Sequence, residues 1–352
     1  MKILHCADVH LGSKMESKFP KEISDERKRE VRAAMNRMVD YADKNGIKII
    51  MLSGDIFDSD RPLKKDKEFF YSVVKNNPDI DFLYLRGNHD KQESYVEYGL
   101  ENLKTFSDVW TSYDYGETVI TGIEIDEKNA LSLYSSLKLQ PEKNNIVMLH
   151  GQLAKSSGIC KIQLSKLRNK NINYLALGHI HAFEKGKIDE RGQYAYCGCL
   201  EGRGFDELGK KGFIVIDTDE NNSINFVPNC LRVLEEVDVD ISDTEDLYKA
   251  CQKVQNFIKC NPSDIVKVNL SGEVSFDTEG LDKEIEKQIA HKYYFVYVKN
   301  GAVLKCDATS VEGDTSLKGE FIRVILDGGY SEEDKSAILN CGLKALSGRE
   351  VE

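Results

Sequence analysis

Short apolar runs recur along the first 230 residues and predict buried strands. They are rich in Ile, Val, Leu and Tyr, and they span 2–7, 47–52, 81–85, 146–149 and 174–177. None alternates apolar with polar positions, so each run is apolar on both faces, as expected for a strand that lies between two layers. Between these runs the pattern is helical. Strands and helices that alternate at this spacing predict an α/β layered sheet.

Two helices are predicted between the first three runs. The first covers 24–45, with Ser24 as its N-cap, acidic residues in its first turn and Gly46 just beyond its end. These are the usual start and stop signals of a helix. The second covers 64–75 and ends before Pro78, because the residue before a proline disfavours helical geometry.

The pattern changes after the fifth run. Strands at 194–199 and 212–217, separated by a glycine-rich turn, complete a first domain over 1–230. A second domain over 231–352 is predicted from shorter alternating elements. These are strands at 233–239, 265–270 and 294–298, and helices at 244–258, 281–290, 317–326 and 331–346. The expected fold is α/β, a two-layered β-sheet core flanked by helices, with a smaller C-terminal α+β cap.

Composition and charge narrow the class of protein. With 41% hydrophobic and 30% charged residues, a chain of 352 residues can bury a sizeable core. No apolar run approaches the ~20 residues of a membrane span, and the first residues are too polar for a secretory signal, so we expect a cytoplasmic protein without membrane contact. The net charge of −11 lies mostly in residues 231–352, which carry −9 against −2 for residues 1–230.

Each of the five apolar runs leads into metal-ligand residue types. The segments that follow the runs are Asp8-Val9-His10, Gly54-Asp55-Ile56-Phe57-Asp58, Gly87-Asn88-His89-Asp90, His150-Gly151 and Gly178-His179-Ile180-His181. Taken alone, each has an ordinary explanation as a turn, a surface pair or a core histidine. Five in order are different, because open α/β sheets bind ligands beyond the carboxyl ends of their strands. The pattern therefore predicts one converging metal site.

The residue types favour two divalent ions. Carboxylate, imidazole and amide groups without thiolates suit Mn²⁺, which we expect first, and also Mg²⁺, Fe²⁺ or Zn²⁺. Seven ligands are enough for two ions that share a carboxylate: Asp8, His10, Asp55, Asn88, His150, His179 and His181. Two ions about 3.5–4 Å apart suit the hydrolysis of a phosphate ester.

The order of these motifs resembles the calcineurin-like metallophosphoesterase superfamily over about residues 1–220. Two segments, Ala7-Asp8-Val9-His10-Leu11-Gly12 and Gly54-Asp55-Ile56-Phe57-Asp58, resemble its SbcD-type branch of DNA repair exonucleases. A third, Tyr196-Cys197-Gly198-Cys199, departs from the Tyr-Pro-Gly-Ser-like segment of that branch at both cysteines.

The resemblance implies a role for each residue. One ion would be held by Asp8, His10, Asp55 and His181, and the other by Asp55, Asn88, His150 and His179. His89 would be the acid that faces the leaving-group oxygen, and Asp58 would orient it. An imidazole beside a carboxylate suits this task, although a purely structural role for His89 is the alternative.

The resemblance also implies DNA as substrate and an SbcC-like coiled-coil ATPase as partner, docked by the C-terminal helices; a homodimer is left open. Lysines follow each ligand motif, as at Lys14, Lys64, Lys65 and Lys155, and would face phosphates if their loops rise on the ligand face. The alternative is that these lysines are ordinary surface residues. The expected function is a DNA exonuclease or endonuclease. The alternatives are a small-molecule phosphatase or nucleotide phosphodiesterase, and a non-catalytic scaffold.

Overall fold

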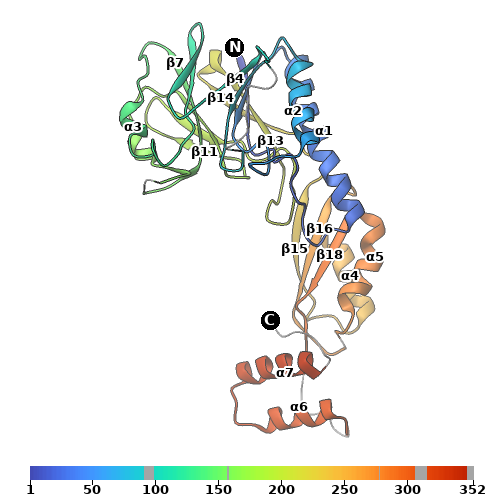
Figure 1. Ribbon diagram of the computed structural model, residues 1–352. Coiled ribbons are helices and arrows are strands. Elements are labelled where there is room, and N and C mark those ends of the chain that lie inside the picture. Colours follow the sequence, from blue (N-terminus) through green and yellow to red (C-terminus); the bar gives the residue numbers. More distant parts are fainter. Residues whose placement is uncertain (91–98, 157, 277, 306–314, 347–352) are drawn as a thin grey trace. The chain divides into compact units, whose positions relative to one another are not determined.

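The computed structural model describes residues 1–90, 99–156, 158–276, 278–305 and 315–346. The chain divides into two compact units, Met1–Leu234 and Glu235–Glu352 (Figure 1). All of the predicted ligand residues belong to the first unit.

The first unit contains two six-stranded sheets. In spatial order, the first sheet consists of β14 (Ser223–Pro228), β13 (Gly212–Asp217), β1 (Lys2–Cys6), β2 (Ile49–Ser53), β3 (Asp81–Leu85) and β4 (Leu103–Thr105). Strands β1 to β4 are parallel, and β13 and β14 are antiparallel to their neighbours. The second sheet consists of β11 (Glu184–Lys187), β12 (Gln193–Tyr196), β10 (Tyr174–Gly178), β7 (Asn144–His150), β6 (Thr118–Gly122) and β5 (Thr111–Tyr115). Its four central strands are parallel.

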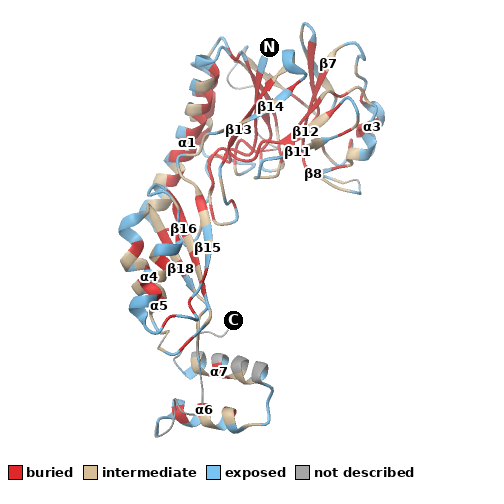
Figure 2. Cartoon of the chain, turned by 180° about the vertical axis from the view of Figure 1, so that it is seen from behind, coloured by how far each residue is buried: buried red, intermediate tan, exposed pale blue. Residues whose placement is uncertain are grey.

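Three apolar clusters hold these layers together. The middle cluster joins the facing surfaces of the two sheets, with Met51 from the first and Met148 from the second. A second cluster packs the first sheet against the helices α1 (Lys21–Lys44) and α2 (Lys64–Lys75). A third covers the outer face of the second sheet with α3 (Leu133–Ser136) and neighbouring loops. The central strands are therefore buried on both faces (Figure 2), and the predicted α/β class with two flanked sheets is confirmed.

The helix α2 has the predicted bounds, whereas α1 begins three residues earlier than expected. Its N-cap is Pro20, and the Ser24 N–H already donates to the Pro20 carbonyl at 2.9 Å. The prediction of Ser24 as N-cap was therefore wrong. The fixed φ of proline suits the entry to a helix, so no side-chain cap is needed to begin this one.

Short elements complete the first unit. They are the strand pair β8 (Gln152–Leu153) and β9 (Lys161–Ile162), and 3₁₀ turns at Leu164–Lys166 and Thr218–Glu220. Among the described residues, no helix is both long and apolar enough to cross a membrane.

The second unit is smaller and has its own core. Its main sheet consists of β15 (Leu234–Asp240), β16 (Ile265–Ser271) and β18 (Phe295–Asn300), with β17 (Glu273–Val274) paired to β19 (Val303–Leu304). The helices α4 (Leu247–Phe257) and α5 (Leu281–Ile289), followed by a 3₁₀ turn at Ala290–Lys292, pack on this sheet. The helices α6 (Leu317–Asp327) and α7 (Glu332–Leu346) share a separate small apolar cluster that includes Ile322, Ile325 and Leu339.

Candidate metal centre

The strand ends bring the predicted ligands together. Asp8 and Asp55 each lie two residues beyond a parallel strand of the first sheet, and Asn88 follows β3. In the second sheet, His150 ends β7 and His179 directly follows β10. The carboxyl ends of these strands meet across the sandwich, since the His150 Nδ1–H donates to the Ser53 carbonyl of β2 at 2.9 Å.

The backbone at these positions is unusual. Asp8, His10, Asp55 and His179 all have positive φ, at 51°, 50°, 51° and 104°. Such a conformation is uncommon for a residue other than glycine and persists only where the surroundings enforce it. Here the loops hold each other, because the Asp8 N–H donates to the Gly54 carbonyl and the His10 N–H donates to the Asp55 carbonyl, both at 3.0 Å.

Glycines allow the loops to approach so closely. A Cβ atom at Gly87 would lie 2.1 Å from the Asp55 carboxylate, and one at Gly178 would lie 2.0 Å from the Ser53 carbonyl oxygen. Real Cβ atoms do not make such contacts, so both positions require glycine.

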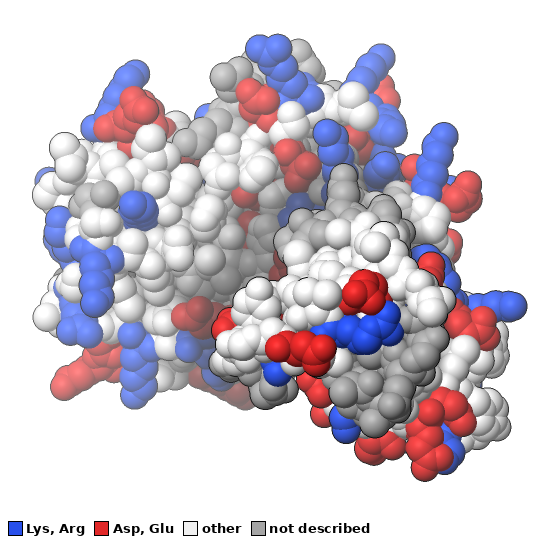
Figure 3. All heavy atoms as spheres, turned by 90° about the horizontal axis from the view of Figure 1, so that it is seen from below, with Lys and Arg blue, Asp and Glu red and all other residues white. Residues whose placement is uncertain are grey.

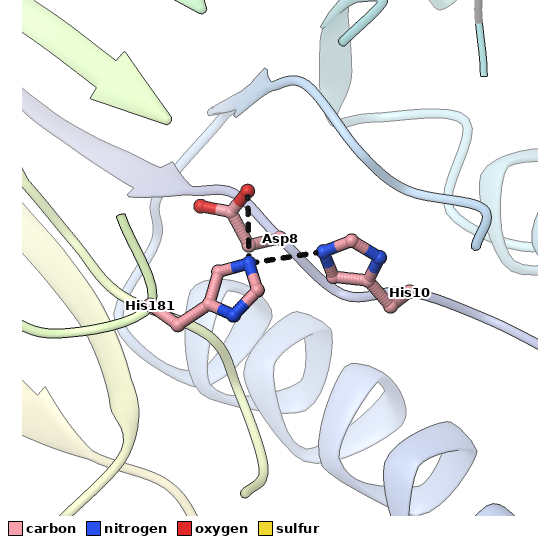
Figure 4. Close-up of side chains that lie close together, drawn as sticks. All are labelled: Asp8, His10 and His181. Atoms are coloured by element: carbon pink, nitrogen blue, oxygen red, sulfur yellow. Dashed lines mark hydrogen bonds and ion pairs between the residues drawn. The ribbon is translucent and has the colours of Figure 1, made fainter. Parts of the chain in front are cut away.

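The first group of ligands is Asp8, His10 and His181 (Figure 4). The Nε2 atoms of His10 and His181 are 3.2 Å apart, and His181 Nε2 lies 3.9 Å from the Asp8 carboxylate. Asp8 is fully buried, and both of its carboxylate oxygens accept from the His179 N–H at 3.0 Å.

The second group is Asp55, His150 and His179, joined by Asn88. His150 Nε2 lies 3.2 Å from the Asp55 carboxylate, and the Asn88 Oδ1 atom lies 3.0 Å from both His150 Nε2 and His179 Nδ1. The same Asp55 oxygen is 3.9 Å from His10 Nε2 in the first group. Asp55 therefore stands between the two groups, where a shared ligand would lie.

Carboxylates lie beside the Nδ1 atoms of two of the ligand imidazoles, which favours the tautomer with its proton on Nδ1. His10 Nδ1 lies 3.0 Å from the Asp58 carboxylate, and His181 Nδ1 lies 2.7 Å from Glu207. In neutral imidazoles with their protons on Nδ1, lone pairs remain on the two facing Nε2 atoms. Lone pairs this close repel each other unless a cation lies between them, so the residues present fit a bound metal ion.

The pKa values at the site reflect a competition between burial and nearby opposite charges. Burial raises the pKa of the Asp8 carboxyl to about 6 and lowers the pKa of His10 to about 4. Burial also acts to lower the pKa of His150, but its contacts with Asp55 and Asp8 raise that pKa to about 9. Burial acts to raise the pKa of Asp55 as well, but His150 and His10 hold it well below its usual range. A proton on His150 thus places one positive charge beside Asp55 and Asp8. A bound divalent cation would place a larger positive charge there.

His89 and Asp58 lie at the edge of these groups. His89 is exposed, its N–H donates to Asp55 at 2.9 Å, and its Nδ1 lies 3.2 Å from the main-chain carbonyl of Asp58. The Asp58 side chain has partners other than the expected His89, because its carboxylate faces His10 Nδ1 and the Arg203 guanidinium. Asp58 thus contacts His89 through its carbonyl group.

Sequence reasoning assigned no role to three charged residues at this site. Glu207 is buried beside His181, and Arg203 lies between Glu207 and Asp58. The sequence held one hint of Arg203 and Glu207, because both lie in the glycine-rich segment 202–209. The sequence pattern predicted only a turn there. The third is the buried Asp90, which accepts from the Gly87 and Ile56 N–H groups and so ties the loop after β3 to the loop after β2.

Comparisons with known proteins place the chain in a family and show several relatives. The calcineurin-like phosphoesterase family matches residues 1–183, just over half of the chain. The DNA double-strand break repair protein Mre11 of Sulfolobus acidocaldarius is 24% identical over 97% of this chain and 94% of its own length. The SbcD component of the nuclease SbcCD of Staphylococcus epidermidis is 23% identical over 73% of this chain and 76% of its own length. The uncharacterized metallophosphoesterase YhaO of Bacillus subtilis is 26% identical over 73% and 67%.

The matched residues include the strands of both sheets that precede the predicted ligands, from β1 to β10. They also include the first and last of these ligands, Asp8 and His181. The chain belongs to the calcineurin-like phosphoesterase family.

Proposed function

We propose that this protein is a phosphodiesterase that uses two divalent metal ions to cleave DNA. The observation that carries the proposal is the position of Asp55 between two groups of ligands. Asp8, His10 and His181 would hold one ion, Asn88, His150 and His179 would hold the other, and Asp55 would be shared. Mn²⁺ is our first choice, with Mg²⁺, Fe²⁺ and Zn²⁺ as alternatives, because the donors are oxygen and nitrogen atoms.

The chain's own residues would then act around the phosphoryl group. Bound divalent ions supply Lewis acidity at phosphoryl oxygens and a water of lowered pKa. His89 is exposed next to both groups, and donation of its Nδ1–H to the Asp58 carbonyl leaves Nε2 directed elsewhere. We assign His89 the transfer of a proton to the leaving oxygen, and Asp58 the positioning of both His89 and His10.

DNA as the substrate is supported by the relatives and by a basic pocket beside His10. This pocket of about 90 Å³ is also lined by Lys28, Arg32 and Lys65. Lys65 is exposed, and Arg32 is paired with the buried Asp66 at 2.5 Å. Lysines placed this near the ligands would contact phosphates on one side of the scissile bond.

The ATPase partner is proposed from the name of one relative, the SbcD component of the nuclease SbcCD. By that analogy, the α6–α7 region would dock on an SbcC-like coiled-coil ATPase. Phe321 and Ile338 of these helices pack into their shared cluster, whereas Leu317 and Val324 are 73% and 59% exposed. A binding test with the ATPase should begin with substitutions of these two exposed apolar side chains.

A second candidate, a nucleotide phosphodiesterase, is favoured by another pocket. It has a volume of about 240 Å³ and reaches both Asn88 and His150, and its lining also includes Asp108, Asp126 and Arg86. The carboxylates of Asp108 and Asp126 would accept hydrogen bonds from the amino groups of a nucleobase. The substrate of this candidate is therefore a mononucleotide or dinucleotide.

The test compares linear DNA with a mononucleotide phosphodiester in the presence of Mn²⁺, for the wild type and for Asp55→Ala. We expect the wild type to bind two Mn²⁺ ions per chain and to cleave DNA. Asp55→Ala should lose at least one ion and all measurable cleavage, because both groups of ligands share this carboxylate.

Unchanged turnover with two ions per chain in Asp55→Ala would refute the assignment of the site. Cleavage of the mononucleotide alone, with the ATPase present or absent, would favour the second candidate. A wild type that binds no Mn²⁺ would instead support the scaffold interpretation.

A further inference from the structure

The imidazoles of the two ligand groups are supported in different ways. His150 donates from Nδ1 to a main-chain carbonyl, that of Ser53, at 2.9 Å. The Nδ1 atoms of His181 and His10 instead lie close to side-chain carboxylates, those of Glu207 at 2.7 Å and Asp58 at 3.0 Å. A main-chain carbonyl is the same whatever residue provides it, whereas a carboxylate brings a full negative charge and can be lost by substitution.

Arg203 joins the two carboxylates. Its Nε–H donates to Glu207 at 3.0 Å, and Nη1 donates to Asp58 at 3.1 Å and to the Ser13 hydroxyl at 3.2 Å. Nη2 donates to Glu207 and lies 3.1 Å from His181 Nδ1. Because each guanidinium nitrogen already has a protein partner and the side chain is only 14% exposed, Arg203 is suited to holding its neighbours. Direct contact with substrate would require these bonds to break.

We propose that Arg203 and Glu207 are positioning residues that set the affinity for one of the two ions, the one held by Asp8, His10 and His181. This inference rests on the two-ion centre of the proposed function. It adds that the affinities for the two ions depend on different supporting residues. Glu207 acts through His181, and Arg203 acts through both Glu207 and Asp58. The ion held by His150 and His179 does not depend on this pair.

The physical basis is the effect of a carboxylate on a ligating imidazole. A carboxylate at Nδ1 fixes the tautomer and the ring orientation, and it makes Nε2 a stronger donor to a metal. Loss of such a partner typically lowers metal affinity by about 10–100-fold.

A neighbouring buried acid provides a matched control. Glu201 lies in the same segment and is as buried as Glu207, but its carboxylate pairs with Arg27 at 2.9 Å and with Arg37 at 3.3 Å. Among the described residues, the other groups that donate to it are main-chain N–H groups of the 231–232 segment, and none of its partners is a predicted metal ligand. Glu201→Gln removes one buried charge from this segment, as Glu207→Gln does, without touching an imidazole.

The experiment titrates the 352-residue chain with Mn²⁺ after metal removal, and free Mn²⁺ is followed by electron paramagnetic resonance. For Glu207→Gln we expect one ion to bind as in the wild type and the other to bind about 10–100-fold more weakly. Arg203→Lys, which cannot span both carboxylates, should weaken the same ion. Glu201→Gln should lower the melting temperature and leave both affinities unchanged.

A double-variant comparison identifies the affected ion. If Glu207 acts through His181, Glu207→Gln combined with His181→Asn should bind Mn²⁺ no more weakly than His181→Asn alone. Wild-type affinity for both ions in Glu207→Gln and Arg203→Lys would overturn the proposal, and so would equal weakening by Glu201→Gln. The titration contains no DNA, so a protein that binds two ions but cleaves no DNA would refute the proposed function and leave this inference intact.

Discussion

Substitution of His89 tests whether this residue acts as a general acid or as a metal ligand. His89 is exposed and contacts the centre through its N–H and Nδ1, which bond to Asp55 and to the Asp58 carbonyl. We expect His89→Gln to retain both Mn²⁺ ions and to lose about 10²–10⁴-fold in turnover, the usual size of a general acid contribution. Metal content and single-turnover cleavage measure the two effects. Loss of an ion in this variant would make His89 a ligand.

A histidine away from the metal centre has a predictable effect on stability. His5 is fully buried in β1, with Nδ1 2.8 Å from the Tyr174 hydroxyl, and burial lowers its pKa to about 3. The unfolded chain binds a proton at His5 below a pH of about 6.5, whereas the folded protein does not. His5 therefore reduces stability as the pH falls from about 6.5 towards 3, by up to about 1.4 kcal/mol per pH unit.

The variant His5→Asn keeps a polar atom near the Tyr174 hydroxyl and does not titrate. Its free energy of unfolding in urea should fall less than that of the wild type between pH 7.5 and 5.5. The control is His291→Asn, which removes an exposed histidine of the second unit. Parallel pH profiles for the wild type and His5→Asn would contradict the prediction.

At the scale of residues, the sequence indicated the ligands but not their supports. Asp8 and His150 could be located because each follows an apolar run, and a strand end is a place that sequence patterns reveal. Glu207 and Arg203 follow no such run, and their contacts with His181 depend on how the intervening loops fold. Asp58 was found, but its partner was not, because the choice between His89 and His10 depends on a rotamer.

At the scale of elements, the approach of β10 to β2 is the most sensitive contact. A methyl group at Gly178 would lie 2.0 Å from the Ser53 carbonyl oxygen and 2.9 Å from His150 Nδ1, so it would break the bond between those two groups. We expect Gly178→Ala to destabilise the fold by about 1–3 kcal/mol. It should also weaken the ion held by His150.

Urea unfolding of the metal-free protein and Mn²⁺ titration measure these two effects of Gly178→Ala. The control is Gly329→Ala, where an added Cβ has no atom within 4 Å. If Gly178→Ala bound both ions as tightly as the wild type, the supporting role of the Ser53 carbonyl would be refuted.

The elements that sequence patterns identified are those with strong periodicity or continuous apolar character. The bounds of α2 agree residue for residue, and the run at 81–85 is β3. In contrast, β4 and β5 were not predicted. The strand β5 reads Thr-Ser-Tyr-Asp-Tyr and is only partly buried at the edge of its sheet, so its pairing with β6 stabilises it more than its own composition does.

At the scale of the whole molecule, most of the net negative charge belongs to residues 231–352, although both signs of charge occur on the surface. Figure 3 shows lysine and arginine side chains interspersed with aspartate and glutamate on the face in view. With a net charge of −11, attraction of DNA would have to be local to the metal centre and its basic pocket.

We therefore expect the position of a lysine to matter more than the net charge. Lys28 and Lys65 line the pocket beside His10, whereas Lys2 and Lys48 lie at the opposite ends of β1 and β2 from the ligands. Changing either pair to Gln removes two charges. Only Lys28→Gln with Lys65→Gln should flatten the salt dependence of DNA binding, by about 0.9 in the log–log slope for each lost phosphate contact. Equal slopes for the two double variants would exclude this pocket as a DNA contact.

The strand order of the first sheet has a consequence for synthesis of the protein. The strand β1 pairs with β2 on one side and on the other with β13, which is made more than 200 residues later. Likewise, the Asp8 carboxylate accepts from the N–H of a residue 171 positions further along. A nascent chain on the ribosome therefore has no complete centre until nearly all of the first unit has emerged. Metal loading must follow translation of that unit, and fragments released early would carry no hydrolytic activity.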